Sequence, residues 1–159
     1  MNVKPRTSNL EPRTLNGEAA NASVTSGRHG KANVYNLEER LLEFSVKVIE
    51  VSENLPKTRA GNHLAGQLLR AGTSPYGNHG EAQAPESMDD FIHKMKVCLK
   101  ELRETRRWAR LIARLGWLKG DTGLTFVLGE VEELIRIFKA SVRTAEHNRL
   151  ARNPPAGPG

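Results

Sequence analysis

The chain has 159 residues, 38% hydrophobic and 26% charged, which is enough for one domain with its own core. No apolar run approaches the ~20 residues of a membrane-spanning helix, and no apolar block of signal-peptide type follows Met1. A lone cysteine, Cys98, excludes an internal disulfide. We therefore expect a cytoplasmic protein with no membrane partner.

The first element of the chain is a tail, and a helix follows it. Residues 1–34 show no sustained periodicity and few large apolar groups, so we expect a disordered basic tail. A helix from Asn36 to Leu55 is predicted, with Asn36 as N-cap, Glu39 as its capping-box partner and Pro56 as the stop. Its buried stripe comprises Leu37, Leu41, Phe44, Val48, Val51 and Leu55. We expect Leu42 and Ile49 to lie beside this stripe and to widen the apolar face of the helix.

Three further helical segments follow. One runs from Asn62 to Ala82, and we expect Pro75 to kink it before it resumes. The next begins at the N-cap Ser87 and ends at Leu115, and the last spans Leu124–His147. With no credible strand, the sequence predicts an all-α, antiparallel up-down four-helix bundle over residues 36–150, and a second disordered tail over 151–159.

The Ser87–Leu115 helix carries two stripes, each with alternating spacings of three and four. The apolar stripe consists of Phe91, Met95, Cys98, Leu102, Thr105, Ala109 and Ile112. The cationic ridge consists of Lys96, Lys100, Arg103, Arg107, Arg110 and Arg114. At about 100° per residue the ridge is centred roughly 150° from the apolar stripe, so it should face solvent.

Charge is segregated along the chain although residues 36–150 are nearly balanced, with eighteen basic and sixteen acidic residues. Residues 94–119 hold nine basic residues against two acidic ones, whereas residues 36–54 hold five glutamates against two basic residues. Such polarity can steer a charged partner. The ridge therefore either follows the phosphates of a nucleic acid or is a solvated face that pairs with glutamates, including those of another copy. Aromatic residues make up only 5%, so direct base reading is not predicted.

Trp108, Leu111 and Leu115 lie on the flank between the apolar stripe and the ridge. We expect these three residues to form a subunit interface, because their offset from the stripe indicates a second contact surface.

No pattern in the chain indicates catalysis or a metal site. The histidines have no paired metal-ligand spacing, and Asp89 and Asp90 complement the dipole at a helix start. Cys98 lies in the apolar stripe and is expected to be a small buried hydrophobe. We expect neither a catalytic residue, nor a metal, nor a cofactor.

Residues 36–147 resemble the four helix bundle proteins related to the 23S ribosomal-RNA intervening-sequence proteins. Three segments carry the resemblance: His63–Ala82, Asp90–Leu111 and Glu132–Ala145. The resemblance implies an antiparallel bundle that assembles into a ring, with pentamers known in the group. A related protein, the accessory variability determinant of diversity-generating retroelements, is a basic nucleic-acid-binding partner of a reverse transcriptase.

The leading hypothesis from the sequence is a non-enzymatic, oligomeric four-helix bundle that binds RNA or DNA through backbone phosphates along the ridge. It would act as an accessory to a nucleic-acid enzyme such as a reverse transcriptase. The alternative is a protein-protein scaffold whose charges serve subunit pairing.

Overall fold

The computed structural model describes residues 36–152; both predicted tails, apart from residues 151 and 152, lie outside that range. Four α-helices occur there, and no strand is present between residues 36 and 152. They are α1 (Leu37–Glu53), α2 (Arg59–Ala82), α3 (Met88–Leu115) and α4 (Thr122–Arg152). The predicted fold class is confirmed.

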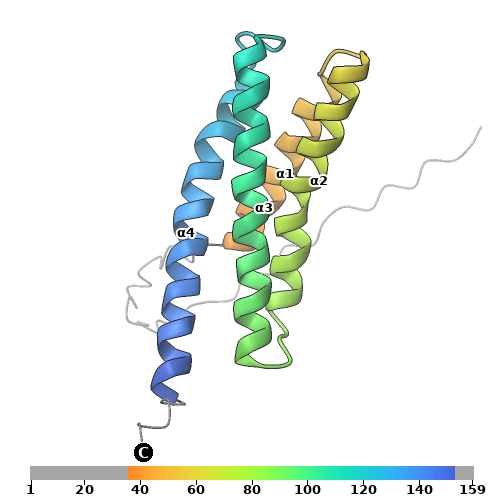
Figure 1. The fold of residues 1–159 in the computed structure, drawn as a ribbon. Helices are drawn as coiled ribbons and strands as arrows, with labels where there is room; N and C mark the ends of the chain where they lie inside the picture. The colour runs from red at the N-terminus through yellow and green to blue at the C-terminus, as the bar shows by residue number, and fades with distance from the viewer. Residues whose placement is uncertain (1–35, 153–159) are drawn as a thin grey trace, which may run out of the picture. The chain divides into compact units, whose positions relative to one another are not determined.

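The helices form an antiparallel bundle (Figure 1). Each helix contacts the next one along the chain, and α1 closes the ring against α4. The α1–α2 and α3–α4 turns lie at one end, while the α2–α3 turn lies at the other (Figure 1). This order places α3 and α4 side by side, so outward-facing residues of the two helices can form one surface.

Helix starts are fixed by side-chain caps. Asn36 and Ser87 accept hydrogen bonds from the backbone amides three residues on, each at 3.1 Å, as predicted. Helix α2, however, starts three residues before Asn62, because the Thr58 hydroxyl caps it by accepting from the Gly61 amide. Helix α4 starts at Thr122 because the Asp121 carboxylate accepts from the Leu124 amide at 2.7 Å.

Three predictions about helix length have clear outcomes. Helix α2 continues through Pro75 to Ala82, so the expected resumption is confirmed. Helix α4 extends to Arg152, five residues beyond the predicted His147. Helix α3 ends where predicted, because Gly116 adopts a left-handed conformation with φ 68° that terminates the helix.

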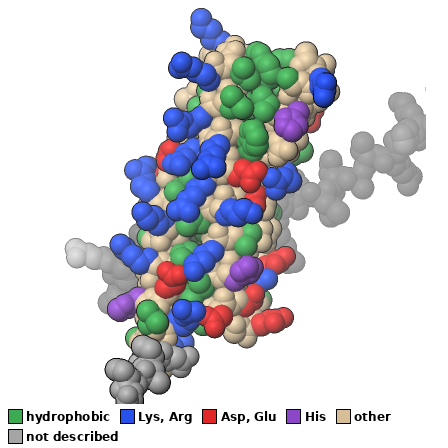
Figure 2. Space-filling view, viewed as in Figure 1, with side chains coloured by type: hydrophobic (Ala, Val, Ile, Leu, Met, Phe, Trp, Pro, Cys, Tyr) green, Lys and Arg blue, Asp and Glu red, His purple; other side chains and the backbone are tan. Residues whose placement is uncertain are grey.

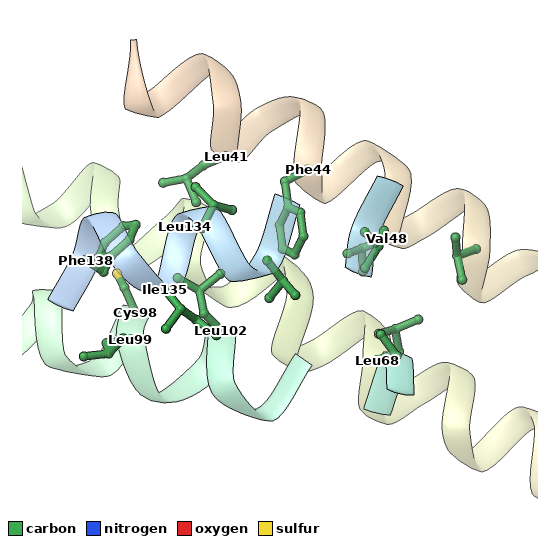
Figure 3. Packing of buried hydrophobic residues seen from close by; sticks show 14 of the residues in the cluster. Leu41, Phe44, Val48, Leu68, Cys98, Leu99, Leu102, Leu134, Ile135 and Phe138 are labelled. Carbon is green, nitrogen blue, oxygen red and sulfur yellow. The ribbon is translucent and has the colours of Figure 1, made fainter. Parts of the chain in front are cut away.

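Inward-facing stripes of all four helices form one continuous core (Figure 3). The predicted stripe of α3 is buried from Met95 to Ile112, and Phe91 packs partly buried against it. Gly72 of α2 lies so close to α1 that a Cβ there would stand 2.5 Å from a methyl group of Val48. The α1–α2 contact therefore depends on a residue without a side chain.

Leu42 and Ile49 lie beside the buried stripe of α1 and widen its apolar face, as predicted, but they are not part of the core. Their side chains are 39% and 44% exposed, and Val46 between them is also exposed. Only α2 and α4 pack against α1. Together they cover a narrower arc of the helix circumference than the apolar residues of α1 occupy. The outer side of α1 thus presents an apolar stripe to solvent.

Candidate nucleic-acid interface

All six residues of the predicted cationic ridge on α3 are exposed. They occupy about 27 Å of helix between Lys96 and Arg114, at 1.5 Å per residue. The buried stripe occupies the opposite side of the same helix, so the geometry that the sequence predicts for α3 is present.

Most of the ridge has no acidic partner within the bundle. Lys96 Nζ lies 2.6 Å from the Glu146 carboxylate, and Lys100 Nζ lies 3.9 Å from that of Glu101. The other four members form no salt bridge with any acidic residue between residues 36 and 152: Arg103, Arg107, Arg110 and Arg114. Their charges are therefore available to an external anion.

Helix α4 adds a second row of cations that the sequence analysis missed. Arg136, Lys139 and Arg143 are exposed, and together with Leu99 of α3 they line a groove of about 420 Å³. Arg136 pairs with Glu133, whereas Lys139 and Arg143 have no salt bridge among the described residues. Their spacing of three and four residues in the sequence indicates that they share one side of a helix. Only the contact between α3 and α4 in the structure shows that this row lies beside the ridge.

We call these two rows together the basic face. It consists of Lys96, Lys100, Arg103, Arg107, Arg110 and Arg114 of α3 and Arg136, Lys139 and Arg143 of α4. Lysine and arginine side chains gather along the length of this side of the molecule (Figure 2).

Other cations are used to hold helices together. Arg106 of α3 bonds Glu132 of α4 at 3.1 Å, and Arg40 of α1 bonds Glu130 of α4 at 2.6 Å. Partly screened bridges of this kind contribute little stability each, but they show where acid and base are matched. The basic face stands out because most of its cations are unmatched.

Trp108 lies on the α2 side of the ridge and makes three internal contacts. Its indole Nε1 donates to Glu104 at 3.3 Å, its ring meets His63 edge to face at 6.4 Å, and it packs partly buried against the core. Leu111 and Leu115 are 42% and 43% exposed. The assignment of these three residues to a subunit interface stays a prediction.

The ridge runs between two shallow grooves. One, of about 650 Å³, is lined by Lys100, Arg103, Glu104, Arg107, Trp108 and Leu111. The other, of about 750 Å³, is lined by Arg107, Arg110, Leu111, Ala113, Arg114 and Leu128. In both grooves guanidinium groups border exposed apolar carbon, which suits a ligand with anionic and flat apolar parts.

The described residues contain no cluster of three metal-ligating side chains. Burial raises the pKa of the Cys98 thiol to about 12, so it remains protonated and unreactive at neutral pH. No helix between residues 36 and 152 is both long and apolar enough to cross a membrane.

The geometry thus defines the class of protein: an antiparallel four-helix bundle with one cationic side. The family model of the 23S rRNA-intervening sequence protein matches residues 35–140. The chain therefore belongs to the 23S rRNA-intervening sequence protein family, and the resemblance inferred from the sequence is confirmed.

A solved structure shares the fold. It is a protein of unknown function from the S23 ribosomal protein family of Bacteroides thetaiotaomicron, 27% identical, with a TM-score of 0.61. The match covers 66% of this chain and 96% of that one. No curated protein matches the chain.

Proposed function

We propose that the protein is a non-enzymatic nucleic-acid-binding bundle whose basic face contacts backbone phosphates. The observation that carries the proposal is the set of four ridge arginines without an acidic partner in the bundle. Unpaired, exposed guanidinium groups match phosphate oxygens in geometry and charge. The second row on α4 widens the surface.

The proposal predicts strongly salt-dependent binding. Each phosphate that the face neutralises releases condensed counterions, which lowers the slope of log K against log salt by about 0.7 for a single strand and 0.9 for a duplex. Four arginine contacts alone give a slope of about −3 to −4. A surface patch that meets only a neutral partner would show little of this dependence.

We also propose a place for such a protein in the cell. We infer that it works in the cytoplasm as a homo-oligomer, with the pentamer as the expected ring, and assists a nucleic-acid enzyme such as a reverse transcriptase. Exposed apolar side chains support self-association, since five of the eight large ones in the described residues lie on α1 and α2. The membership of the chain in a family named after an rRNA insertion supports a nucleic-acid role.

The direct test reverses three charges of the face. Arg103→Glu/Arg107→Glu/Arg110→Glu should reduce RNA and DNA binding by at least a hundredfold at moderate salt, because three attractive contacts become repulsive. The matched control, Lys57→Glu/Arg59→Glu/Arg152→Glu, changes the net charge from +6 equally but alters exposed residues away from the face. Control binding should fall far less.

Circular dichroism must show both variants folded, and the milder Arg103→Gln/Arg107→Gln/Arg110→Gln variant guards against misfolding. If the two charge-reversed variants lost nucleic-acid affinity equally, the net charge of the protein would explain the loss. That result would contradict a localised binding site. Absence of wild-type binding at low salt would end the proposal.

A second candidate function is a protein scaffold. The exposed stripe of Leu42, Val46 and Ile49 on α1, with Leu69 and Tyr76 on α2, favours it because monomeric proteins seldom leave such patches uncovered. A scaffold without a nucleic-acid role would self-associate normally and bind no nucleic acid at any salt concentration.

A further inference from the structure

We propose that the groove beside Trp108 holds a nucleobase of single-stranded nucleic acid while the neighbouring arginines hold its phosphates. The inference rests on the proposed function and names the class of nucleic acid. The Trp108 indole supplies a flat apolar surface, Leu111 adds exposed apolar carbon, and Lys100, Arg103 and Arg107 supply positive charge around them. A groove of about 650 Å³ is within the size range of small-ligand sites.

The indole is held in place before any ligand arrives. Glu104 accepts the Nε1 hydrogen at 3.3 Å, and Arg70 of α2 holds Glu104 in turn at 2.5 Å. The His63 ring stands against the indole at an interplanar angle of 89°. An aromatic ring fixed from two helices loses little freedom when a base stacks on it, which favours binding.

The preference for single-stranded over double-stranded nucleic acid follows from how a base can reach the indole of Trp108. In a duplex the bases are stacked and paired, so one would have to be extruded first. In a single strand a base is free to stack on an aromatic side chain while the backbone follows a cationic groove. Stacking of this kind tolerates any base, so the groove should show little sequence preference.

A protein surface fits the groove less well than a nucleotide does. An apolar partner would cover Leu111 and Trp108 but would also bury Arg103 and Arg107, which have no acidic partner between residues 36 and 152. Burying unpaired charge is strongly unfavourable. A nucleotide supplies the apolar ring and the anion together.

The experiment uses Trp108 fluorescence in a Trp117→Phe background, since the chain has two tryptophans. A single-stranded oligonucleotide should quench the Trp108 emission, and a duplex of the same length should leave it nearly unchanged. Trp108→Leu should weaken single-strand binding about tenfold while duplex binding changes less than twofold. Trp108→Phe, which keeps an aromatic ring, should retain most of the affinity and guards against a folding defect.

Several results would overturn the inference, and they differ from those that overturn the function. Equal quenching by both strand types, or an equal loss of both in Trp108→Leu, would sink the nucleobase assignment while the arginine variants could still uphold phosphate binding. Loss of an oligomer in Trp108→Leu by light scattering, with equal losses for both nucleic acids, would assign the groove to a subunit contact instead. No wild-type binding of either strand type would remove both proposals.

Discussion

The two long sides of the bundle differ in what they offer a partner. The α3–α4 side carries the nine cations of the basic face, six of them without a salt bridge among residues 36–152. The α1–α2 side carries five exposed large apolar side chains, with five glutamates along α1. Both sides are built on similar buried stripes, so the difference arises entirely from outward-facing residues.

This contrast teaches that the fold and the function draw on different positions of the same helices. Inward positions follow the 3.6-residue period and specify the bundle. Outward positions are free to vary, and here they separate a surface for polyanions from a surface that exposes apolar side chains. Substitutions can therefore test each set separately.

The largest change in the free energy of unfolding should come from a substitution at an inward-facing residue of α1, and an outward-facing residue of the same helix serves as its comparison. Phe44 is fully buried, so Phe44→Ala should lower the free energy of unfolding by about 3–5 kcal/mol. Ile49→Ala should cost less than about 1 kcal/mol, because Ile49 is exposed. Urea denaturation measures both, and similar costs would mean that the α1 stripe is covered in solution.

Two glycines of α2 give the next comparison. Gly72→Ala should destabilise the bundle by about 1–3 kcal/mol, since its Cβ would stand within 2.5–2.7 Å of the Val48 methyl groups. Gly66→Ala should stabilise it by up to ~1 kcal/mol, because a Cβ there meets nothing within 4 Å and alanine favours the helix. Thermal unfolding of the two variants should shift the midpoint in opposite directions, and shifts of the same sign would refute the close α1–α2 packing.

A smaller effect concerns His79, a polar residue inside the bundle. Burial lowers the pKa of its imidazole, although Glu38 partly opposes the shift. The unfolded chain then binds the proton more readily than the folded one, so stability present above about pH 6.5 declines as the pH falls below it. The contribution is at most about 1.4 kcal/mol per pH unit, because one proton is involved.

The measurement compares unfolding free energies at pH 7.5 and 5.5 for wild type and His79→Gln. The wild type should lose more stability over this range than the variant. An identical loss in both proteins would show that His79 titrates normally in the folded state.

The smallest expected change in stability comes from Leu42→Gln/Val46→Gln/Ile49→Gln. These side chains are exposed, so the monomer should keep its stability to within about 1 kcal/mol and its nucleic-acid affinity to within twofold. Self-association measured by light scattering should weaken. A large loss of nucleic-acid binding would show that the two sides are not independent.

The sequence predicts the features that the period of a single helix determines. It misses the features that depend on how neighbouring helices pack. The stripe from Met95 to Ile112 and the ridge on α3 follow directly from the helical period. The α4 row, including Lys139 and Arg143, required knowing that α3 and α4 lie side by side and in which register. Periodicity alone does not define how wide an arc of a helix its neighbours cover, so it did not show that Ile49 stays exposed.

Helix starts were ambiguous for a local reason. Thr58 and Asn62 are both good N-cap residues, and the sequence does not state which one the chain uses. The groove beside Trp108 needed the structure most, because Glu104 and Arg70 come together only when α2 packs on α3.

The salt dependence of nucleic-acid binding tests the central claim most directly. For wild type, a plot of log K against log salt should be linear with a slope of about −3 or steeper. In Arg103→Gln/Arg107→Gln/Arg110→Gln the slope should become shallower by about 2 to 3, as three phosphate contacts are lost. An unchanged slope in that variant would contradict a basic face that acts through its unpaired arginines.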